Sequence, residues 1–368
     1  MSGQDKNSAI DLDMNKICRT ATIIVSFIGL YLINQMMYIR ENYHKDAKPA
    51  FESFSYHLPR MAFWSIIVSI GRAIIQYITQ DFAIYWYMKT TTKNTEVYKD
   101  KIKPVISNLI WYSFITTFGY IYVAYNNKIV PKTLGGSKEY DEVCSKNYPY
   151  LDMREIDYLY FHVQFGSKIY SLFKTILFER EFADFWEMFL HHLVSILLMI
   201  LCLFSNVTEV GLIVLLIHDP GDVALNLMKI YRYVIPKAYK PTIFTIIISV
   251  SSVVFWILPR VGIQPFSLFS RILTFLMNIR KYSAYEIDDS ILSSLLILMS
   301  SIFAVLLILY FMNLYWSMFA LRVVASFLFK GEFQYHHGAK ITKAEKEKEK
   351  KKKDKGKKEK KLVKNKID

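Results

Sequence analysis

The chain has 368 residues, of which 53% are hydrophobic, and it carries a formal net charge of +14 at pH 7. Only 13 residues are Gly, and neither G-x-x-x-x-G-K nor G-x-G-x-x-G occurs, which excludes the Gly-rich loops that cradle nucleotide phosphates. The three Cys residues are widely spaced, which excludes a zinc ribbon and a disulfide framework.

Long apolar stretches predict an all-α integral membrane protein, built as a multi-span helical bundle. A membrane-spanning helix needs about 20 largely apolar residues. In chain order, eight stretches meet this length: 18–39, 61–80, 104–125, 157–177, 185–204, 208–231, 241–258 with an apolar continuation to about 279, and 291–317. The first is too long for the core of a signal peptide and no small-residue cleavage site follows it, so we expect a retained anchor.

The distribution of positive charge predicts the orientation of these spans. The segments 89–104 and 232–240 and the C-terminal tail are rich in Lys and Arg, whereas in 126–156 the basic residues are balanced by acids. Because positive charge in short loops favours the cytosolic side, we expect the basic segments and both chain ends in the cytosol.

The C-terminal tail is the most polar part of the chain. Fifteen Lys between Lys340 and Lys366 give it a net charge of +9 and leave +5 for the rest. Such a segment cannot bury enough apolar surface to fold, and without interleaved aromatic residues it favours contact with anionic lipid over nucleic acid. Its last five residues, K-N-K-I-D, fit a K-x-K-x-x pattern that resembles a dilysine retrieval signal of the endoplasmic reticulum.

Ionisable side chains interrupt the fifth and sixth apolar stretches, where such groups are costly and mark a functional site. They are His191, His192, His218, Asp219 and Asp222. The two stretches turn around near Asn206, so an antiparallel hairpin places His191 and Asp222 at equal depth, and we expect them to face one another. This constellation is the predicted site.

The second half of the constellation has helical spacing. His218, Asp219 and Asp222 are three or four residues apart, which predicts one shared helix face. That face continues through Asn226 and Lys229 towards the cytosolic end. Pro220, inside the same stretch, predicts a kink or local unwinding of the helix.

The residue types alone leave two other interpretations of this constellation open. The histidines can be buried and satisfied by hydrogen bonds that hold the helices together. Alternatively, His and Asp are good zinc ligands, so three of these groups could hold a single zinc ion.

The same residues carry a resemblance to a known family. The block D-F-W-E-M-F-L-H-H-L-V-S at 184–195, followed by H-D-P-G-D at 218–222, resembles the Lag1 motif of ceramide synthases in the TRAM-LAG1-CLN8 (TLC) family. The 27-residue gap from His191 to His218 matches the family's spacing, and R-V-G-I-Q-P-F at 260–266 resembles its R-L-G-I-x-P-F segment. The resemblance implies a TLC-type seven-span catalytic domain over about 61–331, an N-terminal region with one added span at 1–60, and a disordered tail at 332–368.

The family resemblance also implies an activity, namely transfer of a fatty acyl group from acyl-CoA to the amine of a sphingoid base in the endoplasmic reticulum membrane. Acyl-CoA is then a co-substrate, and neither a cofactor nor a metal is expected. His191 would form an acyl-imidazole, Asp222 would fix its tautomer, and His218 or Asp219 would serve as the base. His192 would support the site or bind the acceptor.

Substrate contacts are expected near the cytosolic ends of the spans. We predict CoA-phosphate contacts at Arg180, Lys229 and Arg232, each of which could instead be a positive-inside anchor, and further substrate contacts at Asn226 and Arg260. A homo- or hetero-oligomer is left open.

The chain departs from the family pattern at three places. Phe182 and Ala183 stand where the family has basic residues, the pair Pro220 and Gly221 replaces small or apolar residues, and Lys168 lies in mid-span, where no charge is expected. Two other functions therefore remain as alternatives: a membrane zinc-dependent amide hydrolase of ceramidase type, and a non-catalytic TLC protein that binds lipid or associates with a translocon.

Overall fold

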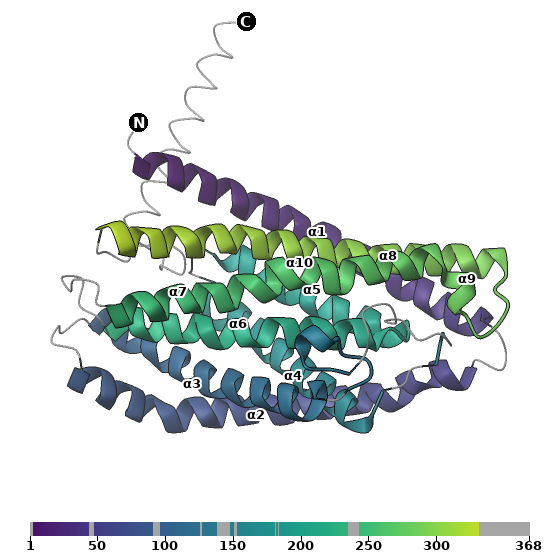
Figure 1. Cartoon of the computed structure of the whole chain (residues 1–368), viewed down its shortest axis with the longest axis horizontal. Helices are drawn as coiled ribbons and strands as arrows, with labels where there is room; N and C mark the ends of the chain where they lie inside the picture. Colours follow the sequence, from purple (N-terminus) through teal and green to yellow (C-terminus); the bar gives the residue numbers. More distant parts are fainter. Residues whose placement is uncertain are drawn as a thin grey trace, which may run out of the picture.

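A computed structural model describes residues 3–43, 48–90, 96–125, 127–137, 148–150, 153–180, 182, 184–234 and 243–330. Across these ranges the chain forms long helices and no β-sheet (Figure 1). The α-helices are α1 (Gly3–Asn42), α2 (Lys48–Thr90), α3 (Glu96–Phe118), α4 (Glu155–Phe178), α5 (Phe185–Phe204), α6 (Thr208–Val234), α7 (Ile243–Ile257), α8 (Ser270–Met277), α9 (Ile279–Tyr282) and α10 (Asp289–Lys330). The predicted all-α bundle is confirmed.

Within the described residues, six helices are long and apolar enough to cross a membrane: Lys16–Asn42, Ser55–Tyr85, Phe185–Phe204, Thr208–Ile230, Ile246–Met277 and Asp289–Phe329. The other two predicted spans are also helical, in α3 and α4, but α4 is less apolar because it buries polar residues such as Asp157, His162 and Gln164. The count of eight spans therefore stays a prediction, while six of them are confirmed as helices fit to span.

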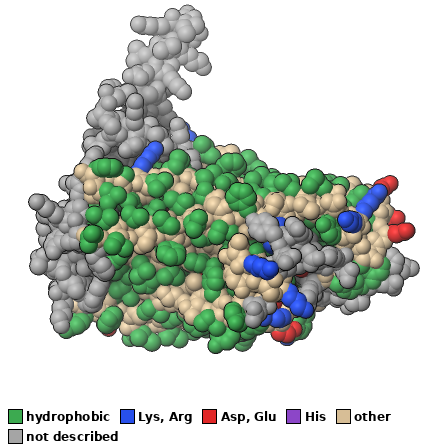
Figure 2. All heavy atoms as spheres, in the orientation of Figure 1, with side chains coloured by type: hydrophobic (Ala, Val, Ile, Leu, Met, Phe, Trp, Pro, Cys, Tyr) green, Lys and Arg blue, Asp and Glu red, His purple; other side chains and the backbone are tan. Residues whose placement is uncertain are grey.

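The surface of the bundle is suited to lipid. Figure 2 shows hydrophobic side chains over most of the visible face, with few charged groups among them. Large apolar side chains such as Phe27, Ile66, Tyr77 and Phe114 are exposed along the helices. Since contiguous exposed apolar surface of this extent is unusual for a soluble monomer, the chain is a multi-pass membrane protein.

The helices α5 and α6 form the central hairpin of the bundle. In the most apolar segment of each span, 67% of α5 and 72% of α6 is buried inside the protein. In the other candidate spans the buried share is 17–39%. The turn lies at Asn206, as expected, and this residue adopts a positive φ of 52°, a conformation that Asn tolerates. Its side-chain amide donates to the carbonyl oxygen of Pro149 at 3.1 Å, which ties the hairpin to a neighbouring loop.

Of the predicted kink or local unwinding at Pro220, the unwinding is not observed, because α6 continues as an α-helix from Thr208 to Val234, and the kink stays a prediction. Pro220 cannot donate to the carbonyl oxygen four residues earlier, which belongs to Leu216. The hydroxyl of Tyr120 donates to that oxygen instead, at 3.0 Å. A side chain from a π-helical turn (Gly119–Ala124) therefore satisfies the backbone that the proline frees, and the helix does not need to unwind.

The predicted continuation of the seventh span is also present, with a change of helix type. After α7 the chain passes through two π-helical segments, Leu258–Ile263 and Pro265–Phe269, and then enters α8. Each segment contains a proline, Pro259 in the first and Pro265 in the second. A proline prevents regular α-helical hydrogen bonding, which accounts for these wider turns. They place Arg260 beside α6.

Several orientation signals fall outside the described part of the chain. These are the segments 91–95 and 235–240 and the tail from 332 to 368, which includes the K-x-K-x-x pattern. The predicted domain boundary at residue 60 lies inside α2, and the division into three parts stays a prediction.

Candidate active site

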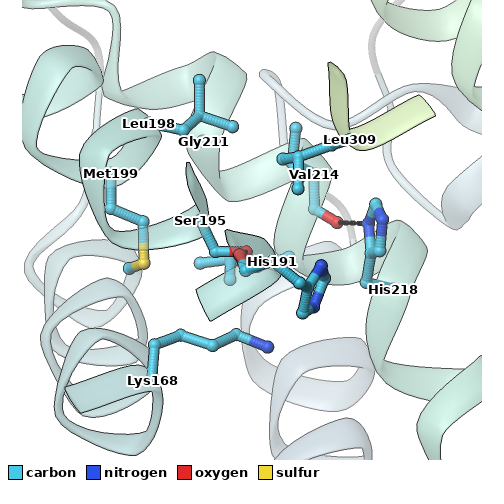
Figure 3. A pocket seen from close by; sticks show the side chains of 10 residues that line it. Lys168, His191, Ser195, Leu198, Met199, Gly211, Val214, His218 and Leu309 are labelled. Carbon is cyan, nitrogen blue, oxygen red and sulfur yellow. Dashed lines mark hydrogen bonds between the residues drawn. The ribbon is translucent and has the colours of Figure 1, made fainter. Parts of the chain in front are cut away.

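A small cavity of about 30 Å³ lies among α4, α5, α6 and α10. Its walls are mainly apolar, and four polar side chains reach it: Lys168, His191, Ser195 and His218. In Figure 3 Lys168, His191 and His218 lie on one side of the cavity, with Leu198 and Gly211 on the other. The structure thus brings together the two histidines at the centre of the predicted site and adds the unexpected mid-span lysine.

His191 presents its imidazole to this cavity from α5. The indole of Trp316, from α10, meets the imidazole edge-on, with ring centroids 5.1 Å apart and an interplanar angle of 76°. Its Nδ1 atom is buried and has no hydrogen-bond partner among the described residues. The ring is therefore held by packing, and one of its nitrogens is uncommitted.

Among the described residues no hydrogen bond joins Asp222 to His191, and the predicted role of Asp222 in fixing the tautomer stays a prediction. Asp222 Oδ1 instead accepts a hydrogen bond from Arg260 Nη2 at 2.5 Å, an ion pair whose side chains are only 19% and 4% exposed. The same Nη2 donates to the carbonyl oxygen of His218 at 2.7 Å. Equal depth in a hairpin gives the height of a side chain, whereas rotation about the helix axis decides which neighbour it meets.

The guanidinium of Arg260 is buried and binds other groups of the protein, and its predicted contact with substrate stays a prediction. It packs over the ring of Trp256, 4.8 Å from the centroid, and ties the π-helical segment to α6. Gly221 makes this approach possible, because a Cβ there would lie 3.0 Å from Arg260 Nε and from Trp256 Cδ1. One of the departures from the family pattern thus has a local packing reason.

His218 has both ring nitrogens bonded. Its Nδ1 lies 2.7 Å from the carbonyl oxygen of Val214, which can only accept, so Nδ1 carries the proton (Figure 3). Its Nε2, 3.1 Å from Asn313 Nδ2, then accepts a hydrogen bond from that amide. His218 is assigned as a neutral imidazole with a lone pair on Nε2. Asn313 was missed, although a lone Asn in the apolar stretch 291–317 is a signal for a polar contact.

The side chain of Asp219 points towards α4 and binds residues of that helix. Its Oδ2 accepts from the hydroxyl of Tyr160 at 2.5 Å and from Gln164 Nε2 at 2.6 Å. The three residues keep the predicted helical spacing, because α6 is continuous from Thr208 to Val234. The three side chains reach three different neighbours, α10, α4 and the π-helical segment after α7.

The other predicted residues surround the site. His192 is buried with its ring centroid 5.5 Å from that of His191. Asn226 donates to the backbone oxygen of Asp222 at 2.7 Å, Arg180 is exposed and donates to that of Ile176, and Lys229 is half-buried. Arg232 lies in α6, but its side chain is not among those described. Their roles in binding CoA or acceptor stay predictions.

A metal site was the other interpretation of the constellation. Within the described part of the chain, no three His, Cys, Asp or Glu side chains are grouped in a way that could hold a metal ion. Asp219 and Asp222 have hydrogen-bond partners on other helices, and so has His218.

Fold and site define a multi-pass helical membrane protein whose histidines open onto a buried cavity. The chain belongs to the TLC domain family (TRAM, LAG1 and CLN8), whose model matches residues 105–322, more than half of the chain. This matched region contains every predicted catalytic residue.

Curated relatives carry the name ceramide synthase. The chain is 29% identical to ceramide synthase 4 of Bos taurus over 193 residues, which are 52% of this chain and 44% of that protein. It is 28% identical to ceramide synthase hyl-1 of Caenorhabditis elegans over 221 residues, 59% and 56% of the two chains. To human ceramide synthase 5 it is 27% identical over 192 residues, 51% and 43%. The chain spans about half the length of the curated relatives it matches.

Proposed function

We propose that this protein is an acyl-CoA-dependent N-acyltransferase of the ceramide synthase type, which joins a fatty acyl group to the amine of a sphingoid base. The observation that carries the proposal is His191, which reaches a cavity inside the bundle with one ring nitrogen free of hydrogen bonds. Relatives named ceramide synthases support the substrate class. The reaction needs neither ATP nor a resident cofactor, because a thioester is already an activated acyl donor.

In the first step the neutral imidazole of His191 attacks the thioester carbonyl carbon. A carbon–nitrogen bond forms, the carbon–sulfur bond breaks, and CoA leaves as a thiolate that takes up the proton released by the acylated imidazole. The product is an acyl-imidazole, which divides acyl transfer into two easier steps. Trp316 holds the ring in place during the attack.

In the second step the neutral amine of the acceptor attacks the acyl-imidazole carbon. The amide bond forms and the bond to His191 breaks; the amine loses one proton, and the departing imidazole of His191 regains one. The Nε2 lone pair of His218 is suited to the amine's proton, once it exchanges the Asn313 amide for the acceptor. His218 therefore acts in the second half of the reaction.

The size of the cavity requires movement before either substrate can bind. A volume of about 30 Å³ holds only a few water molecules, whereas ligand pockets measure several hundred Å³. Leu198, Met199 and Leu309 line it and are apolar, so their displacement would open a channel suited to an acyl chain. We place the protein in the endoplasmic reticulum membrane with its C-terminus in the cytosol, where acyl-CoA is supplied.

The test is acyl transfer by the purified full-length protein in lipid vesicles. Sphinganine and palmitoyl-CoA should give one amide for each CoA released, with CoA followed by a thiol reagent and the amide by mass spectrometry. His191→Ala should abolish both, whereas His162→Gln, a buried histidine of α4 bonded to His57, should retain them. Absence of transfer by the wild-type protein over a range of bases and acyl donors would overturn the proposal. Chelator-sensitive cleavage of ceramide would support the hydrolase in its place.

A further inference from the structure

Lys168 is a cation in the middle of α4, and its side chain extends into the cavity towards His191 (Figure 3). Among the described residues, no carboxylate lies within ion-pair distance of its Nζ. The two acids nearest to the site bind other donors: Asp222 pairs with Arg260, and Asp219 accepts from Tyr160 and Gln164. Lys168 is thus available to an anion in the cavity.

Besides the nucleophile His191, the other polar residues of the cavity wall are Ser195 and His218, and their hydrogens are engaged in other bonds. The hydroxyl of Ser195 donates to the carbonyl oxygen of His191 at 2.7 Å. The proton of His218 is on the nitrogen that donates to Val214, and its other nitrogen is an acceptor. Of the polar side chains that line the cavity, the donor left uncommitted beside the nucleophile is the ammonium of Lys168.

An unpaired cation in an apolar, membrane-embedded cavity is costly, and such residues mark function. The proposed reaction generates an anion at this place. When a nitrogen of His191 attacks the thioester, the carbonyl π electrons move onto oxygen, within the space that Lys168 shares with His191. A preorganised positive charge aimed at a developing oxyanion is among the largest contributions to catalysis.

We propose that Lys168 is a catalytic residue that stabilises the oxyanion of the tetrahedral adduct on His191, an inference that rests on the proposed function. The His191 lone pair forms the carbon–nitrogen bond, and the oxyanion forms against the ammonium of Lys168. The electron pair then returns, the carbon–sulfur bond breaks, and CoA leaves as a thiolate that takes up the proton released by the acylated imidazole. Lys168 neither gains nor loses a proton, and the same contact serves the adduct formed by the acceptor amine.

The experiment compares Lys168→Met, which keeps the length and removes the charge, with Lys168→Arg, which keeps the charge. Lys168→Met should lower kcat by about 100-fold to 1,000-fold, with KM for palmitoyl-CoA changed by less than about threefold. In a single turnover without sphinganine, CoA release should slow by the same factor. Lys168→Arg should recover at least about tenfold of the loss. The matched control is Lys174→Met on the same helix. The Nζ of Lys174 lies 3.1 Å from a carboxylate oxygen of Glu179, and Lys174 does not line the cavity, so this variant should keep kcat.

Two results would overturn the assignment. One is an unchanged kcat in Lys168→Met; the other is a loss confined to KM, which would make Lys168 a contact for an anionic head group. If Lys168→Met does not fold, as judged by its thermal midpoint, Lys168→Gln is measured in its place against the same limits. A wild-type protein that transfers acyl groups, with His191→Ala inactive and Lys168→Met fully active, would remove this inference and leave the proposed function standing. No transfer by the wild type would remove both.

Discussion

The hydroxyl of Tyr120 lies 3.0 Å from the carbonyl oxygen of Leu216, the backbone acceptor that Pro220 leaves without its helical donor. This contact keeps α6 continuous through the centre of the site, from Thr208 to Val234. His218 and Asp222, which follow Leu216 on α6, therefore keep their helical positions. From there His218 reaches Asn313 of α10, and Asp222 reaches Arg260.

Removal of this hydroxyl should destabilise the protein. We expect Tyr120→Phe to lower the free energy of unfolding by about 1 kcal/mol, because a buried carbonyl loses its donor in a membrane interior. Unfolding in mixed micelles measures the change. In a Pro220→Leu background the residue 220 amide can donate to Leu216 instead, so the same Tyr120→Phe change should have a smaller effect. An equal effect in both backgrounds would show that the hydroxyl acts elsewhere.

The ion pair between Asp222 and Arg260 should be a stability determinant. Arg260→Met leaves a buried carboxylate without its cation, and we expect a loss of about 3 kcal/mol or more. Asp222→Asn combined with Arg260→Met removes both charges and should recover a large part of that loss. Chemical denaturation of the single and double variants tests this. If the double variant is no more stable than Arg260→Met, the unpaired charge is not the cause.

Asn313 should act on the second half-reaction. Asn313→Leu removes the amide that holds His218 Nε2 in place, so we expect amide formation from the acyl-enzyme to slow about tenfold. CoA release without acceptor should stay within about twofold of the wild-type rate, because the ring of His191 is packed against Trp316, which the substitution leaves unchanged. Rapid-quench measurements separate the two steps. Equal slowing of both would assign Asn313 to the structure of the whole site.

Gly166 should be indispensable for the packing of α4 against α2. A Cβ at this position would lie 2.8 Å from the backbone oxygen of Trp64 and 2.9 Å from Ser65 Cα, and backbone atoms cannot move aside. We expect Gly166→Ala to destabilise the protein by about 1–3 kcal/mol. Gly71→Ala is the matched control on α2, where a Cβ meets nothing within 4 Å, so it should be neutral or stabilising by about 0.5 kcal/mol. The thermal midpoint should fall in Gly166→Ala, and it should stay unchanged or rise in Gly71→Ala.

The sequence by itself determined the architecture and the centre of the site. Apolar length predicted the helices, and the spacing around Asn206 predicted the central hairpin, because both depend on residues close in the chain. The pattern of charged groups within α5 and α6 pointed to His191 and His218, which do line the same cavity.

Only the tertiary structure decided what these side chains contact. Asp222 meets Arg260, 38 residues away, Asp219 meets Tyr160, and Lys168 reaches the cavity beside His191. The physical reason is that apolar length and residue spacing give the depth of a side chain in the bundle but not the rotation of its helix. That rotation is set by packing against helices distant in sequence, such as the close approach at Gly166 and the room that Gly221 leaves for Arg260.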